Sequence, residues 1–262
     1  MPLFNKLLIV FLFTLYSSIS VFDVEQKSDT TIKNAQEMNS VLVFTKTEGW
    51  RHDSIEAAVE AIYQLGNENN FSVTWTEDAG NFTNDILSGY DAVIFLNTTL
   101  TLFDSDQREA FQRYIQNGGG FVGIHSAADT EYDWPWYGEL VGAYFNSHPN
   151  NPNVRKATID VIDSNHVTTD HLPNRWIRTD EWYNFGYMND QVNVLMRLDT
   201  DSYEGSEHPG NHPIAWYHEF DGGRSFYTGS GHTIESFSEP LYLDHLLGGI
   251  QYAMGMNSNS NE

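Results

Sequence analysis

The residues best suited to chemistry in this chain are histidines that follow apolar runs. His125 comes after GGGFVGI, and the small residues around it predict a sharp turn with a partly exposed side chain. His232 follows GRSFYTGSG, whose Gly-Ser-Gly turn would leave backbone N–H groups free for an oxyanion. An imidazole titrates near neutral pH, so each histidine is a candidate general acid or base, or a metal ligand.

A second polar segment, TKTEGWRHDS, joins an apolar run to a helical pattern. It holds Lys46, Arg51 and His52, and a helix N-terminus beside such cations suits an anionic or oxygen-rich ligand. The alternative is a solvated loop in which Asp53 or Ser54 caps the helix. A further histidine, at position 148, lies in the segment FNSHPNNP.

Carboxylates and aromatic residues meet in the segment RTDEWYNF. Asp180 and Glu181 are adjacent and would point to opposite faces of an extended chain, so at most one of them would enter a site. Trp182 and Tyr183 follow, and aromatic residues beside carboxylates are typical of sugar-binding sites. The alternative is an ordinary edge strand. Trp216, in EHPGNHPIAW, is a third aromatic candidate.

Several common catalytic motifs are missing from the sequence. It holds no G-x-S-x-G, no P-loop and no HExxH, and no G-x-G-x-x-G that follows a strand, since GGG at 118–120 precedes one and is expected to be a turn. The absence of cysteine excludes thiolate nucleophiles and cysteine zinc sites. His208 and His212 have the spacing of a helical metal pair, but the intervening Pro209 and Gly210 and the following proline forbid a helix. We therefore expect a turn there.

The charge of the chain bears on which classes of partner it can bind. Acidic residues number 36 and basic residues 13, a formal charge of −23. Such a surface repels phosphate backbones, so we expect no nucleic-acid partner. Aromatic residues form 14% of the chain, which leaves some of them to contact a ligand outside the core.

The N-terminus has the pattern of a secretory signal peptide over residues 1–20. Lys6 precedes an apolar run from Leu7 to Tyr16, and serines follow. The run is shorter than the roughly 20 residues of a membrane span, although an uncleaved anchor is the alternative. We expect a periplasmic or secreted protein with no stable membrane insertion after signal cleavage. A polar linker over residues 21–40, a domain over 41–256 and a disordered tail over 257–262 would follow.

The hydrophobic pattern predicts an α/β domain that positions these residues. Four apolar runs alternate with helical patterns, which favours a mostly parallel sheet whose ligands lie beyond the carboxyl ends of its strands. Later strands would extend the same sheet or form an antiparallel layer, and a helix would close the domain. The expected strands are 41–45, 71–78, 90–99, 118–125, 156–162, 192–198, 212–220 and 223–231, and the expected helices are 54–66, 105–117 and 242–255.

Taken together, these segments resemble the ThuA-like (trehalose-utilisation) family, which has a class I glutamine-amidotransferase-like fold. The resemblance rests on TKTEGWRHDSI, YDAVIFLNTT, GGGFVGIHSAADT, WPWYGELVGAYFNSHP, DEWYNF, HPIAWYHEFDGGRSFYTGSGHT and LLGGIQYAMG, colinear from Val41 to Gly255. It implies a flavodoxin-like, three-layer core and a role in sugar or glycoside metabolism. It also implies a pocket that uses His52, His125, His148, Glu181 and His232. Since His125 replaces the cysteine nucleophile of true amidotransferases, glutamine hydrolysis is not expected.

These observations lead to an exported carbohydrate-processing enzyme, a hydrolase or isomerase acting on a sugar, glycoside or keto-sugar derivative. The alternative is a non-catalytic glycan-binding protein of the same fold. The catalytic candidates are His125, His232 and Glu181, and the substrate-binding candidates are His52, Arg51, Lys46, His148, Trp182, Tyr183 and Trp216. A divalent metal such as zinc would be bound by some of His52, His125, His148 and His232. We expect His166, His171, His218 and His245 to lie outside the site.

Overall fold

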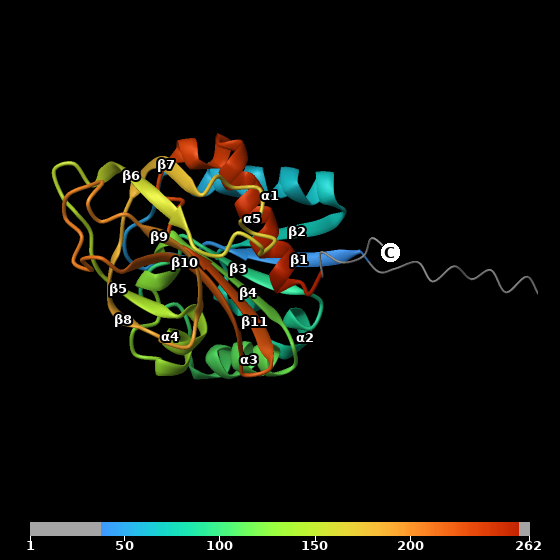
Figure 1. Ribbon diagram of the computed structural model, residues 1–262. Coiled ribbons are helices and arrows are strands. Elements are labelled where there is room, and N and C mark those ends of the chain that lie inside the picture. Colours follow the sequence, from blue (N-terminus) through green and yellow to red (C-terminus); the bar gives the residue numbers. More distant parts are fainter. Residues whose placement is uncertain (1–37, 257–262) are drawn as a thin grey trace, which may run out of the picture. The chain divides into compact units, whose positions relative to one another are not determined.

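The computed structural model describes residues 38–256, in which a nine-stranded sheet lies between two layers of helices (Figure 1). The strand order is β2-β1-β3-β4-β11-β10-β9-β6-β7. The five strands from β2 to β11 are parallel, and each later strand is antiparallel to its neighbour. The strands are β1 (Asn39–Phe44), β2 (Phe71–Thr76), β3 (Ala92–Leu96), β4 (Gly120–Ile124), β6 (Val154–Val161), β7 (Arg175–Glu181), β9 (Asn193–Leu198), β10 (His212–Phe220) and β11 (Gly223–Thr228).

The parallel part of the sheet is the core of the fold. Every residue of β3 and β4 is buried, as continuous apolar runs are when helices cover both faces of a sheet. Helices α1 and α5 cover one face, and α2, α3 and α4 cover the other (Figure 1). Their bounds are α1 (Ile55–Asn69), α2 (Asn84–Leu87), α3 (Ser105–Gln116), α4 (Pro135–Val141) and α5 (Pro240–Ala253). The predicted α/β fold with an extended, mostly parallel sheet is confirmed.

Helix α1 begins where the sequence predicts and ends later. Ser54 is at the N-cap, but its hydroxyl donates to the Gly231 carbonyl instead of capping the helix. The expected end at Gly66 is wrong, because the helix continues to Asn69 and closes at Asn70 with a φ of 58°. Gly66 allows a close approach inside the helix, since a Cβ there would lie 2.7 Å from the Phe71 carbonyl oxygen.

The second half contains elements that the sequence pattern does not predict. Strands β5 (Ala143–Ser147) and β8 (Asn184–Met188) form a separate two-stranded antiparallel sheet. Both strands are short, and their pairing is irregular. Neither has the clear alternation of apolar and polar residues from which a strand is predicted. This small sheet carries the segment that ends in His148 towards the carboxyl edge of the main sheet.

The described residues begin just before the first strand. Strand β1 starts at Asn39, so the last two residues of the expected linker belong to the sheet. The predicted signal peptide (1–20), the linker up to residue 37 and the predicted tail (257–262) lie outside the described residues. Within residues 38–256, no helix combines the length and the apolar character needed to cross a membrane.

Candidate active site

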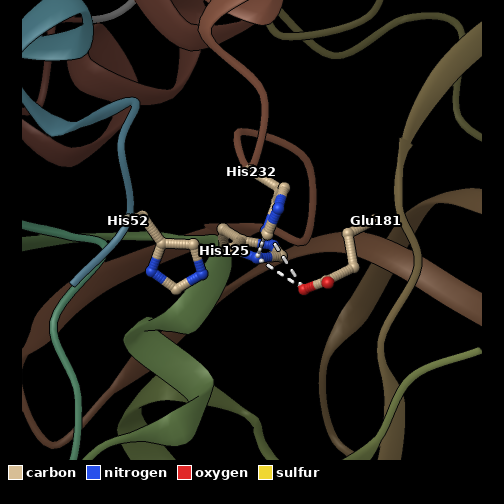
Figure 2. Close-up of side chains that lie close together, drawn as sticks. All are labelled: His52, His125, Glu181 and His232. Atoms are coloured by element: carbon tan, nitrogen blue, oxygen red, sulfur yellow. Dashed lines mark hydrogen bonds and ion pairs between the residues drawn. The ribbon is translucent and has the colours of Figure 1, made fainter. Parts of the chain in front are cut away.

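Four side chains from distant parts of the sequence meet at the carboxyl edge of the parallel strands (Figure 2). His52 lies in the loop after β1, His125 directly follows β4, and His232 follows β11. Glu181 is the last residue of β7. Each of these residues offers one ligand atom, and the four atoms lie within 4.8 Å of one another. We call these four residues the histidine–glutamate cluster.

The distances inside the cluster are those of metal ligands. Glu181 Oε2 lies 3.3 Å from His125 Nε2 and 3.1 Å from His232 Nδ1, and the two imidazole nitrogens are 3.2 Å apart. Ligands bound tetrahedrally about 2.0–2.1 Å from a zinc ion would lie about 3.3 Å from one another. The three atoms therefore already have the spacing that one bound cation would impose.

The histidine rings are oriented by contacts outside the cluster. Nδ1 of His125 lies 3.0 Å from the Gly229 carbonyl oxygen, which only accepts, so the ring proton is on Nδ1 and Nε2 presents its lone pair to the cluster. Nδ1 of His52 lies 3.4 Å from Ser126 Oγ, and Figure 2 shows one nitrogen of that ring directed towards the other three side chains. Both rings are thus held as ligands would be.

The electrostatics of the cluster favour an ionised Glu181 and an uncharged His52. Burial opposes ionisation of Glu181, but hydrogen bonds and charge from His125 and His232 prevail and lower its pKa far below the usual range. Burial, together with the two neighbouring imidazoles, lowers the pKa of His52 to about 2. Burial would lower the pKa of His232, yet Glu181 raises it above its ordinary value. Glu181 therefore favours the protonated form of His232.

The turn at His125 is sharper and more enclosed than the sequence suggests. His125 has a φ of 47° and begins the 3-10 helix η2 (His125–Asp129). This is the left-handed region, which few residues other than glycine adopt. The expectation of a partly exposed side chain is wrong, because His125 is fully buried and the ring of Tyr183 lies 4.1 Å away, centroid to centroid.

Asp180 links two of the segments that carry the cluster, strand β7 and the turn after β11. Its buried carboxylate accepts hydrogen bonds from the backbone N–H groups of Gly231 (2.9 Å) and His232 (3.1 Å). It therefore ties the turn after β11 to β7, whose next residue, Glu181, points into the site. The expectation that the Gly-Ser-Gly turn leaves N–H groups free for an oxyanion is wrong at Gly231, whose N–H donates to this carboxylate, and at Gly229, whose N–H donates to the Ile214 carbonyl.

A cavity of about 470 Å³ opens above the cluster. His52, Glu181 and His232 line it, and His148 and Tyr183 form part of its wall. His148 Nε2 lies 3.7 Å from Glu181 Oε1, and the side-chain amide of Asn153 donates to the same oxygen at 2.6 Å. Trp50 lies at the opening with 72% of its surface exposed. The cluster is therefore accessible to a small polar ligand.

Four predicted substrate-binding residues do not line this cavity. Lys46 pairs with Glu48, and Arg51 pairs with Glu56 and Glu77. Trp182 and Trp216 are fully buried, and their indole N–H groups donate to the carbonyls of Arg155 and Val141. Neighbouring glutamates neutralise the two cations, and the two indole rings pack in the core.

The remaining histidines lie outside the histidine–glutamate cluster and its cavity, as expected for those at positions 166, 171, 218 and 245. His208 accepts from the Phe185 N–H through Nε2, and His212 Nε2 donates to the Tyr183 carbonyl. The pair at 208 and 212 therefore supports the loop behind Tyr183.

Sequence reasoning missed seven of the residues that line the cavity: Trp50, Asp129, Phe145, Asn150, Asn151, Pro152 and Asn153. Trp50 is two residues before His52, and Asp129 is four residues after His125, so both lie in segments already singled out for chemistry. The other five lie in or directly after FNSHPNNP, the segment singled out for His148, but their places depend on the irregular β5–β6 connection.

Comparison with known proteins agrees with this architecture. A family model for ThuA, described as trehalose utilisation, matches residues 40–253. The fold is similar to that of a ThuA-like protein from Bacteroides uniformis ATCC 8492, with 23% identity and a TM-score of 0.70 over 82% of this chain and 91% of the other. A ThuA-like protein from Parabacteroides merdae ATCC 43184 has 18% identity and a TM-score of 0.65, over 85% and 92%. No curated protein matches the sequence.

Proposed function

Because this chain belongs to the ThuA family, we propose that it is a carbohydrate-processing enzyme that binds a divalent transition metal at the histidine–glutamate cluster. The family description, trehalose utilisation, supports a carbohydrate-related role. The observation that carries the proposal is the convergence of three imidazoles and one carboxylate, with ligand atoms within 4.8 Å of one another, beneath a cavity.

The donor set suits zinc or a similar metal. Imidazole nitrogens and a carboxylate oxygen are common ligands of such ions, whereas magnesium and calcium prefer oxygen alone. The rings of His52 and His125 are held by Ser126 and Gly229, which are contacts of the kind that orient metal ligands. Three of the four residues line the cavity, so a substrate oxygen or water can approach from that side.

The chain's own residues would bind and orient the sugar. A bound metal would polarise a substrate oxygen or lower the pKa of a water molecule. Trp50 offers an exposed aromatic face at the cavity mouth, and Asn153 and His148 offer polar groups near Glu181. Such a site supports a hydrolase or isomerase acting on a sugar, glycoside or keto-sugar derivative, with His125, His232 and Glu181 at the reacting centre.

A non-catalytic glycan-binding protein is the second candidate, favoured by the exposed ring of Trp50. Such a protein would need the aromatic platform but would tolerate loss of His125. We also propose that the chain acts outside the cytoplasm, on the basis of the signal-like residues 1–20. The intact mass of protein from its native culture should correspond to a chain without these residues.

The test is an activity screen on keto-glycosides and oligosaccharides, performed before and after chelation. We expect turnover that is lost with a chelator and restored by one added divalent metal. His125→Asn should abolish this turnover, and His171→Gln, outside the site, should not. Sugar binding without turnover, unchanged in His125→Asn, would instead establish the glycan-binding alternative.

A further inference from the structure

We infer that Asp129 is the general acid of the proposed reaction, an inference that rests on the proposed function. Asp129 is the last residue of η2, the 3-10 turn that His125 begins, and it lines the same cavity as His52 and His232. It is not one of the four clustered residues. The cavity thus has a second carboxyl group whose position is fixed by the turn that also positions His125.

The contacts of Asp129 have room for a proton on its carboxyl group. The hydroxyl of Tyr132 lies 2.5 Å from Asp129 Oδ1 and 3.2 Å from the Phe145 carbonyl oxygen. A hydroxyl has one proton, so it donates to only one of these two oxygens. If Tyr132 donates to Phe145, a proton on Asp129 completes the second hydrogen bond. An ionised Asp129 would take the only proton and leave the carbonyl contact without one.

Burial is the factor that favours a proton on Asp129. Burial raises its pKa, while the hydrogen bond from Tyr132 and the charge of His125 oppose this in part. Burial and the adjacent carboxyl raise the pKa of Tyr132, so the hydroxyl keeps its own proton. Asp129 is therefore the group of this pair that releases a proton first, and burial moves its pKa upward. Glu181 is already ionised and has no proton to give.

The step assigned to Asp129 is protonation of the leaving oxygen of a glycoside. The proton moves from the carboxyl to the glycosidic oxygen as the bond between that oxygen and the anomeric carbon breaks. Water then adds its hydroxyl group to the anomeric carbon, and the remaining proton of that water returns to Asp129. In the overall reaction, one glycoside and one water molecule give two hydroxyl products, and no oxidant or reductant is needed. This inference narrows the substrate class to glycosides.

The first test compares Asp129→Asn with Asp133→Asn, which changes a nearby exposed aspartate outside the cavity. Asparagine keeps the shape and the contact with Tyr132 but has no acidic proton. We expect Asp129→Asn to slow hydrolysis of alkyl glycosides by about a hundred- to ten-thousand-fold. Nitrophenyl glycosides, whose leaving group needs no proton, should be slowed far less. Asp133→Asn should resemble the wild type on both substrates.

The second test measures protonation directly. Carboxyl ¹³C titration of the wild type, with Asp129→Asn to assign the signal, should show a midpoint above that of an ordinary aspartate. Equal loss on both classes of glycoside, full activity in Asp129→Asn, or an ordinary midpoint would overturn the inference about Asp129 while the proposed function stands. Wild-type protein that hydrolyses no glycoside would overturn the inference together with the hydrolase form of the proposed function. Metal content should be unchanged in Asp129→Asn, which distinguishes the role of general acid from a role in metal binding.

Discussion

Replacing Asp180 by asparagine should weaken both the fold and the metal site, although Asp180 touches neither the cavity nor a ligand atom of the cluster. Its Oδ1 accepts from the N–H groups of Glu181 and His232, and its Oδ2 accepts from Gly231 N and Ser236 Oγ. Asparagine keeps one accepting oxygen, and its NH2 group would face the Gly231 N–H. An unsatisfied buried donor costs about 1–3 kcal/mol, and hydrogen bonds to a charged acceptor are worth about 1.5–3 kcal/mol each.

From these contributions we expect Asp180→Asn to lower the free energy of unfolding by about 3 kcal/mol. Zinc affinity should fall by about 10- to 100-fold, as it does when groups that orient metal ligands are removed, because the turn that carries His232 is released from β7. Urea unfolding of the metal-free protein would measure the first quantity, and competition with a chelator at a temperature where the variant is folded would measure the second.

The matched control is Asp160→Asn, on the neighbouring strand β6. Asp160 is partly exposed and lies 3.4 Å from an exposed arginine, so its loss should change stability by less than about 1 kcal/mol and leave zinc affinity unchanged. A stable Asp180→Asn variant with wild-type zinc affinity would refute the reasoning. Equal losses in the two variants would also refute it, since the effect would then not depend on the turn.

Three further outcomes are expected. The metal-free protein should become less stable to urea as the pH falls from about 6.5 towards 4. Burial lowers the pKa of His212 to about 4 and that of His245 to about 3, so in this range the unfolded chain binds more protons than the folded one. A stability that does not change with pH would contradict this. Trp50→Ala should weaken glycoside binding by about threefold to tenfold, measured by calorimetry, with unchanged metal content; unaltered affinity would remove Trp50 from the sugar site. His52→Gln should lower zinc affinity, measured with a chelator, whereas His166→Gln should not.

The sequence allowed prediction of the parallel core because its local signals are strong. Strands β3 and β4 and the Val41–Phe44 part of β1 are uninterrupted apolar runs, and α1 has an apolar face at helical spacing. The expectation that at most one of Asp180 and Glu181 enters the site agrees with the cavity, which Glu181 lines and Asp180 does not. By contrast, the β5–β8 pair is short and irregular, and such pairing depends on contacts distant in sequence that local patterns do not contain.

Burial was the property that sequence reasoning predicted least well at the site. Small neighbours suggested an exposed His125, but residues far along the chain, Tyr183 among them, cover the turn. Trp182 and Trp216 are of a residue type that is common in sugar sites, yet they lie in the core. Trp50, in contrast, is exposed at the cavity. An aromatic residue's type does not distinguish packing from ligand contact, because only the tertiary arrangement decides which ring stays exposed.

The central claim is that the histidine–glutamate cluster binds a metal, and the most direct measurement is the metal content of the purified chain after incubation with zinc and desalting. We predict one zinc ion per wild-type chain and less than a tenth of that in His125→Asn. Asparagine is the suitable replacement because it tolerates the positive φ of this turn. His171→Gln should retain the full amount. Wild-type protein that retains no zinc, or as little as His125→Asn, would contradict the account.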